Sequence, residues 1–327
     1  MAKISFELRI LRLALRLVQL YLTVIFSILF LFPAFIGQRL FRVGANLLNL
    51  TDWPRSLKIP NDQRIDIQEL HIAGIPCTTF KPKELRNTGK LILYVHGGGF
   101  MIGSTKTYRS FLGVLADELS CEILSIDYSL APEWRYPTAI NEIQSVHRHL
   151  LTNGHSPKDI LFGGDSAGGC LVLALLYRLR DSSYGVPCGA FLDSPVTDLT
   201  FVGDSMKKNW TQECLLPIFG PFTSMLYKRT FLKYTDGAKL DDPDVSPLFG
   251  SFRDIPPIHI SYSDHEVFRD DAKRLIRVAR SENADVADYS CDWAPHTPLA
   301  LGRFYPEGRA LFQVVCKFIR THLVLVN

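Results

Sequence analysis

From residue 64 to the C-terminus, short segments with strand-like patterns alternate with longer amphipathic ones. Residues 64–72 (RIDIQELHI) and 75–82 (IPCTTFKP) are joined by an Ala-Gly pair, and this combination predicts a β-hairpin. Residues 91–95 form a continuous apolar run, which is typical of a strand buried on both faces. The hydrophobic pattern therefore predicts a folded body that begins near residue 56.

The rest of this body continues the alternation of strands and helices. We expect further strands within residues 122–130, 159–166, 190–196, 257–264 and 287–293. We expect helices over residues 107–119, 137–151, 166–179, 270–280 and 307–321. Strands that alternate with helices predict an α/β fold, with a mostly parallel eight-stranded sheet flanked by helices.

Residues of about 203–241 interrupt this alternation, because they contain no strong strand pattern but many aromatic side chains. These aromatic residues are Trp210, Phe219, Phe222, Tyr227, Phe231 and Tyr234. We interpret the segment as a helical lid inserted into the catalytic domain. Its aromatic residues fit a small core of the lid and direct contact with a substrate equally well.

The N-terminal segment, residues 1–55, has a different character from the body. No charged residue occurs from Val18 to Ile36, a length that suits a membrane span, and basic residues flank this stretch. We predict a membrane-associated segment, either a single-pass anchor at residues 18–36 or an interfacial helix. A lid helix packed on the body and a cleaved signal peptide are the alternatives. The basic residues slightly favour a cytoplasmic N-terminus, but the sequence does not decide in which cellular compartment the enzyme lies.

Composition excludes several classes of function. The net charge of +3 in 327 residues is too small to indicate a nucleic-acid partner. The seven cysteines are scattered without a Cys-x-x-Cys pair, so neither a zinc site nor a disulfide framework is indicated. No phosphate-binding glycine motif occurs either.

The clearest chemical motif is Gly164-Asp165-Ser166-Ala167-Gly168, which fits G-x-S-x-G between an apolar strand and an apolar helix. In this context the motif is typical of a nucleophile elbow, where a tight turn exposes the serine hydroxyl. We therefore predict that Ser166 is a nucleophile. A serine needs a base to remove its proton, and the base needs an acid to orient it.

His296 is the best candidate for the base, because it follows the last expected strand directly. Asp264, at the end of the preceding strand, is our candidate for the acid, with Glu266 and Asp270 as nearby competitors. His265 is a weaker candidate for the base.

His96-Gly97-Gly98-Gly99 follows the buried strand at residues 91–95. Glycine backbone can approach a reacting carbonyl closely, so the N–H groups of these three glycines and of Ala167 are predicted to form an oxyanion hole. His96 and Asp165 are expected to support the loop.

Six motifs in order carry a family resemblance. They are HGGGFMIGS, DYSLAPEWRYP, GDSAGG, DPDVSPLFG, SDHEVFRDDA and the His296 loop. Together they resemble the hormone-sensitive-lipase-like family of α/β-hydrolases over residues 60–325, with Ser129 where the family usually has arginine. The resemblance implies an α/β-hydrolase fold with a helical lid. It also implies a carboxylesterase with a triad of Ser166, Asp264 and His296, and neither cofactor nor metal. In its apolar N-terminal segment the chain is similar to membrane-bound arylacetamide and sterol deacetylases.

We therefore expect a serine hydrolase that cleaves short- to medium-chain or acetyl esters of hydrophobic alcohols through an acyl-enzyme, with a role in lipid metabolism. Hydrolysis of amides by the same residues is one alternative. A non-catalytic small-molecule receptor of the same fold is another, although such receptors characteristically lose the histidine that is present here. The expected partners are a hydrophobic ester and a membrane. The sequence does not decide whether the protein forms a homodimer.

Overall fold

The computed structural model describes residues 4–31, 62–87, 89–216 and 220–325. Within them the eight predicted strands form one sheet. They are β1 (Ile65–Ile72), β2 (Ile75–Pro82), β3 (Leu91–Val95), β4 (Glu122–Ile126), β5 (Ile160–Asp165), β6 (Gly189–Asp193), β7 (Ile258–Ser263) and β8 (Val286–Cys291). Their spatial order is β1-β2-β4-β3-β5-β6-β7-β8. Strand β2 is antiparallel to both of its neighbours, β1 and β4, and β3 to β8 are all parallel to one another.

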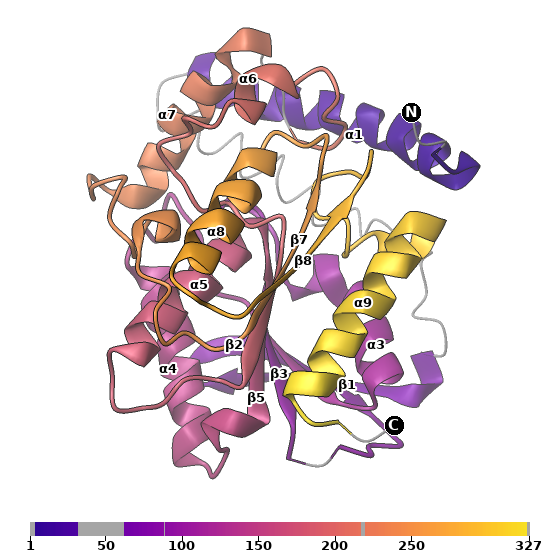
Figure 1. Ribbon diagram of the computed structural model, residues 1–327, viewed down its shortest axis with the longest axis vertical. Coiled ribbons are helices and arrows are strands. Elements are labelled where there is room, and N and C mark those ends of the chain that lie inside the picture. The colour runs from indigo at the N-terminus through magenta and orange to yellow at the C-terminus, as the bar shows by residue number, and fades with distance from the viewer. Residues whose placement is uncertain (1–3, 32–61, 88, 217–219, 326–327) are drawn as a thin grey trace.

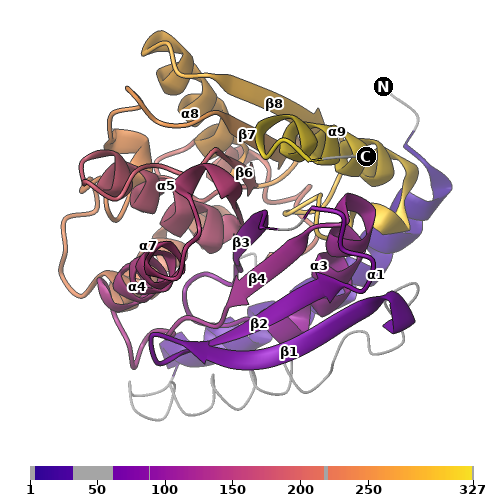
Figure 2. The same ribbon diagram turned by 90° about the horizontal axis from the view of Figure 1, so that it is seen from below.

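The predicted helices are present with ends that differ by one or two residues. In the described part of the chain, the helices of four or more residues are α1 (Phe6–Leu31), α3 (Thr105–Leu119), α4 (Thr138–Thr152), α5 (Ser166–Arg180), α6 (Ser205–Lys208), α7 (Thr223–Thr235), α8 (Arg269–Ser281) and α9 (Pro306–His322). Helices α4, α5 and α8 cover one face of the sheet, and α3 and α9 cover the other (Figures 1 and 2). The predicted α/β-hydrolase architecture is therefore confirmed.

Buried apolar side chains fill both spaces between the sheet and the helices. Helix α5 is apolar on almost every side and lies in the larger of the two clusters, which is why its sequence shows little amphipathic pattern. The central strands are buried along their full length, as the continuous apolar run of β3 predicts. This core holds the carboxyl ends of β5, β6 and β7 in fixed positions.

Helix α1 lies together with α6 and α7 across that end of the sheet, at the top of Figure 1. The buried face of α1 carries Leu8 and Leu15. It also carries Arg12, which donates to the carbonyl oxygens of Trp293 and Gln212 at 2.6 and 2.7 Å, and Gln19, which donates to those of Glu213 and Leu216. Part of the N-terminal segment is thus packed on the enzyme body.

The membrane span predicted at residues 18–36 falls partly outside the described residues, since α1 ends at Leu31. Among the helices that the structure describes, none combines the length and apolar character needed to cross a bilayer. The predicted domain boundary at residues 55 and 56 also lies outside the described residues.

Candidate active site

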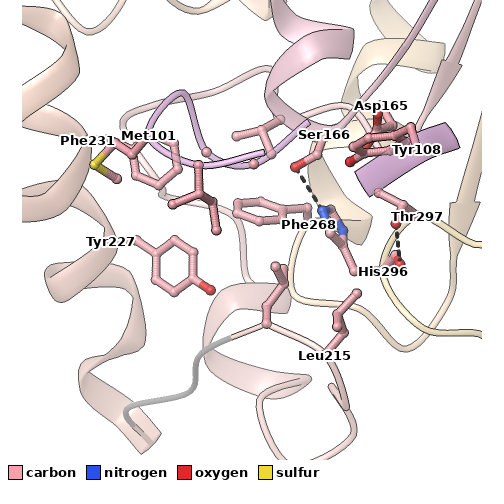
Figure 3. A pocket seen from close by; sticks show the side chains of 15 residues that line it. Met101, Tyr108, Asp165, Ser166, Leu215, Tyr227, Phe231, Phe268, His296 and Thr297 are labelled. Atoms are coloured by element: carbon pink, nitrogen blue, oxygen red, sulfur yellow. Dashed lines mark hydrogen bonds between the residues drawn. The ribbon is translucent and has the colours of Figure 1, made fainter. Parts of the chain in front are cut away.

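Ser166 lies in a tight turn between β5 and α5, at the carboxyl end of the sheet. Its φ of +50° is a left-handed conformation that costs free energy in a residue other than glycine. Gly168 makes the turn possible, because a Cβ atom there would lie 2.1 Å from the carbonyl oxygen of Val95. Glycine thus lets α5 start directly against β3, and the serine hydroxyl faces a cavity (Figure 3).

Three side chains form one hydrogen-bonded row. The Oγ of Ser166 lies 2.9 Å from Nε2 of His296, as the dashed line in Figure 3 shows. The other ring nitrogen of His296, Nδ1, is hydrogen-bonded to Oε2 of Glu266. His296 and Glu266 are 3% and 1% exposed, so this row is shielded from water.

The prediction that Asp264 is the acidic partner of His296 is wrong in its geometry. The Asp264 carboxylate is partly exposed and accepts a hydrogen bond from Nζ of Lys273 at 2.6 Å. Glu266, which we considered as a competitor, takes the place instead. Asp270 pairs with Arg269, and His265 stacks on Trp293 with ring centroids 3.7 Å apart, so neither belongs to the row.

The main chain around Glu266 explains this outcome. Strand β7 ends at Ser263, and the next residues to become fully buried are Glu266, Val267 and Phe268. Two apolar residues that must reach the core carry the preceding carboxylate inward with them. This apolar pair directly after Glu266 is the sequence signal that could have distinguished it from Asp264.

Ser194 is a further member of the site that sequence reasoning missed. Its Oγ donates to Oε1 of Glu266 at 2.8 Å and accepts from the N–H of Thr297 at 3.0 Å. Ser263 also donates its N–H to Oε1 of Glu266. Ser194 thereby fixes the carboxylate and the histidine loop relative to each other.

The surroundings of His296 change its proton affinity. Burial alone would lower the pKa of His296, because it disfavours the charged imidazole. The charge of Glu266 and the hydrogen bond to it outweigh that effect, and the pKa of His296 is raised above its usual value. The site therefore stabilises an imidazolium next to Ser166.

The glycine loop lies beside this row, but its three glycines are not equivalent. The N–H of Gly97 donates to Oδ1 of Asp165 at 2.9 Å. Contrary to our prediction, it is therefore not free to bind a substrate oxygen. Gly98 and Gly99 line the cavity, and no residue that the structure describes accepts a hydrogen bond from either N–H. A Cβ on Gly98 would lie 1.9 Å from the carbonyl oxygen of Ile102, which explains the glycine there.

His96 and Asp165 both hold this loop in place. The ring of His96 is buried, stacks on Tyr128 and places Nδ1 2.7 Å from the carbonyl oxygen of Gly97. Burial lowers the pKa of His96, so Nδ1–H of a neutral ring donates to that carbonyl. Asp165 accepts from the hydroxyls of Tyr94 and Tyr108 as well as from Gly97. Burial raises the pKa of Asp165, and these donors oppose the shift.

The lid insertion closes the cavity above Ser166. Tyr227 and Phe231 of α7 face it together with Met101 and Phe268 (Figure 3), whereas Tyr234 stacks on Phe100 in the core. Among the aromatic residues of the lid, Tyr227 and Phe231 thus line the cavity and Tyr234 lies in the core, whereas Phe222 is exposed and Phe219 lies outside the described residues. The cavity has a volume of about 190 Å³ and a mostly apolar wall.

Two features of the wider site bear on other expectations. In the described part of the chain, no group of three or more His, Cys, Asp or Glu side chains could hold a metal ion. Ser129 donates from N and Oγ to the carboxylate of Glu142 and does not line the cavity.

Comparisons with known proteins show the family to which the chain belongs. Residues 92–297 match the family model described as the alpha/beta hydrolase fold. The chain is 31% identical to an esterase of Acinetobacter venetianus over 264 residues, which cover 79% of this chain and 83% of that protein. It is also 31% identical to an acetyl-hydrolase of Streptomyces hygroscopicus, with coverage of 75% and 80%.

Solved structures of similar proteins share the fold of this chain. The crystal structure of an esterase from the bacterial hormone-sensitive lipase family superposes with a TM-score of 0.81 at 27% identity, covering 99% of this chain and 100% of that one. The crystal structure of EstE5, soaked with p-nitrophenyl butyrate, matches with the same TM-score and identity over 98% and 99% of the two chains. The chain therefore belongs to the alpha/beta hydrolase fold family and is a carboxylesterase-like hydrolase.

Proposed function

We propose that this enzyme hydrolyses carboxyl esters through an acyl-enzyme on Ser166. The observation that carries the proposal is the single row from Ser166 Oγ through both nitrogens of His296 to Glu266. A serine hydroxyl becomes a nucleophile when an adjacent base accepts its proton, and a carboxylate on the far nitrogen stabilises the resulting imidazolium. The raised pKa of His296 reflects this stabilisation.

The reaction takes place in two steps. In the first, Oγ of Ser166 bonds to the ester carbonyl carbon while Nε2 of His296 accepts the hydroxyl proton and passes it to the departing alcohol. In the second, His296 takes a proton from water as the water oxygen attacks the acyl carbon. The proton then returns to Oγ as the carboxylic acid leaves.

The oxyanion that forms in both steps needs prepositioned donors. We assign this role to the N–H groups of Gly98 and Gly99, which line the cavity, and to that of Ala167, which follows the nucleophile in the first turn of α5. A donor of this kind contributes about 10²- to 10³-fold to kcat in a related site. Gly97 contributes indirectly, through its bond to Asp165.

The cavity indicates the size of the substrate. A cavity of about 190 Å³ is small, which suits an acetyl to butyryl ester better than a long chain. Its apolar wall favours a hydrophobic alcohol. The relatives named acetyl-hydrolase and esterase support the same substrate class.

A panel of p-nitrophenyl esters from acetate to dodecanoate, measured on the full-length protein, tests the proposal. We expect kcat/KM to be largest for acetate to butyrate and to fall at least tenfold at the longest chains. The matched anilides should react more slowly by a similar factor or more. Undetectable hydrolysis of every ester would contradict the proposal, and faster hydrolysis of anilides would favour the amidase alternative.

We also propose that α1 lies on a membrane surface. Its outer face presents a stripe of exposed apolar side chains, consisting of Phe6, Ile10, Leu13, Leu17, Leu20, Tyr21 and Val24. The stripe recurs every three to four residues, so it forms one continuous face of the helix. From Leu17 the sequence continues without charge to Ile36, and Arg16 and Arg39 flank this length, as in segments that associate with lipid. The resemblance to membrane-bound deacetylases points the same way.

This proposal predicts a loss of lipid binding when the stripe becomes charged. The double variant Leu13→Glu and Leu17→Glu changes two side chains that are about 70% exposed, so it should keep the fold. We expect its binding to anionic phospholipid vesicles to fall at least tenfold in a flotation assay, because two apolar contacts of about 1.5–3 kcal/mol each are lost. Val314→Glu, on α9, is the control that should float like the parent protein. Equal flotation of all three proteins would refute the surface contact.

A further inference from the structure

A second cavity adjoins the one that contains Ser166. It has a volume of about 220 Å³ and lies between α1, α3 and the segment from Thr297 to Phe304. Tyr108, Leu215 and Thr297 line both cavities, so the two share a wall. In Figure 3, Tyr108 and Thr297 lie on the opposite side of Ser166 from Met101 and Phe231. The second cavity therefore lies on the His296 side of the site.

Most of this second cavity is apolar, with α1 contributing Leu15 and Val18. Phe111, Leu301 and Phe304 complete its hydrophobic wall. No aspartate or glutamate is among the residues that line it. Such a wall suits a hydrocarbon chain. Because the wall has no carboxylate, a cation in it can form an ion pair only with a bound ligand.

Arg303 is the charged group in this cavity, and its guanidinium is not paired. Its Nη1 is buried and has no hydrogen-bond partner among the described residues, where Arg303 also forms no ion pair. The guanidinium instead lies over the ring of Phe304, with Cζ 4.7 Å from the ring centroid. Burial without a carboxylate lowers the pKa of Arg303 from its usual value. The side chain as a whole is half-buried, but a buried guanidinium nitrogen without a partner costs free energy, which an incoming anion would recover.

Ser110 adds a second donor to the same wall. Its Oγ is buried and also lacks a hydrogen-bond partner among the described residues. The other guanidinium groups nearby are occupied, since Arg12 and Arg16 of α1 donate to backbone carbonyl oxygens. The cavity thus combines an apolar wall with one available cation and one available hydroxyl.

We propose that the second cavity binds one end of the ester substrate and that this end carries a carboxylate, which Arg303 and Ser110 bind. The inference rests on the function proposed above and names its substrate class: amphiphilic esters with an anionic group separated from the scissile bond by a hydrocarbon chain. A guanidinium and a carboxylate form charge-assisted hydrogen bonds that a neutral isostere does not replace. A neutral substrate leaves the buried Nη1 of Arg303 without a partner and is therefore the poorer one.

Two substrate pairs test this and show which end of the ester enters. In the first, the anion is on the acyl side: the p-nitrophenyl monoester of adipic acid against p-nitrophenyl adipamate. In the second, it is on the alcohol side: the butyrate ester of 6-hydroxyhexanoic acid against that of its primary amide. The measured quantity is the ratio of kcat/KM for the anionic member over that for the neutral member.

We expect this ratio to exceed ten in one of the two pairs. It should fall about tenfold or more in Arg303→Met and be partly retained in Arg303→Lys, because the lysine keeps the charge. Arg86→Met is the matched control, since Arg86 is exposed in the connection into β3, at the amino end of the strands, and its loss should leave the ratio unchanged. A ratio near one in both pairs, or one that does not depend on residue 303, overturns the inference.

The same data separate the two proposals from each other. If esters are hydrolysed but the ratio of kcat/KM values does not change on substitution of Arg303, only this inference is contradicted. If no ester is hydrolysed, the proposed function itself is contradicted. If Arg303→Met does not fold, an inhibition measurement on the parent protein still tests the inference. Free 6-hydroxyhexanoate or adipamate should inhibit hydrolysis of p-nitrophenyl acetate at least tenfold more strongly than the corresponding amide. Equal inhibition by acid and amide in both cases contradicts the anion site.

Discussion

Ser166→Ala is expected to lower kcat for p-nitrophenyl butyrate by about 10⁵- to 10⁶-fold, because the variant lacks the atom that forms the acyl-enzyme. The fold should persist, since the alanine removes only the hydroxyl from a buried side chain. Stopped assays with a large excess of enzyme can measure so low a rate, and far-ultraviolet circular dichroism checks the fold.

Ser129→Ala is a suitable control for this change. It removes a serine hydroxyl that bonds to Glu142 and does not line the cavity. We expect its kcat to stay within about threefold of that of the parent protein. If Ser166→Ala retained more than a hundredth of the activity, Ser166 would not be the nucleophile.

Glu266→Gln is expected to lower kcat by about 10³- to 10⁴-fold, whereas Asp264→Asn should change it by less than about threefold. The glutamine keeps the shape of Glu266 but removes the charge that stabilises the imidazolium and selects its tautomer. Asp264 instead pairs with Lys273 at a partly exposed site, where one ion pair contributes little. Parallel kinetics on these two variants decide between the carboxylates, and a large loss in Asp264→Asn with an active Glu266→Gln would reverse the assignment.

The same pair of variants changes the pH dependence. His296 must be neutral to accept the proton of Ser166, and its pKa is raised by the Glu266 charge. Activity should therefore disappear as the pH falls, with a midpoint above the usual histidine value of about 6.5. The midpoint should move to lower pH in Glu266→Gln and stay unchanged in Asp264→Asn. A midpoint that is the same in all three proteins would show that Glu266 does not control the base.

The fold could be predicted because its patterns are local. The hairpin turn, the apolar run of β3 and the G-x-S-x-G motif each specify a short element without reference to distant residues. Ser166 and His296 were chosen from the same kind of local signal, since Ser166 lies in the turn that ends β5 and His296 in the loop that follows β8. The ends of helices differed by one or two residues, as for α3, which begins at Thr105 rather than Thr107.

The acid is harder to assign in this way, because distant contacts also orient it. Glu213 accepts from the N–H of Val267, and Asn209 donates to the carbonyl oxygen of Glu266. Both come from the lid insertion, more than fifty positions earlier in the chain. The apolar pair Val267-Phe268 is a local signal that favours Glu266, but it does not record these contacts with the lid insertion. The loss of Gly97 as an oxyanion donor has a similar cause, since its N–H is satisfied by Asp165.

The N-terminal segment shows a different limit of sequence reasoning. Its apolar content predicts a lipid environment, but Leu8, Arg12, Leu15 and Gln19 lie on one side of α1 and face the protein. Their spacing of three to four residues is the period of a helix face. A polar and apolar mixture at that period indicates a face in contact with protein, and the exposed stripe lies on the opposite side.

Covalent labelling with a fluorophosphonate probe, mapped by mass spectrometry on the full-length protein, tests the catalytic row most directly. We predict one phosphonylated residue, Ser166, with labelling abolished in Ser166→Ala, slowed at least a hundredfold in Glu266→Gln and unaffected in Asp264→Asn. Esterase activity that survives with Ser166 unlabelled, or a label on another serine that tracks the loss of activity, would contradict the account.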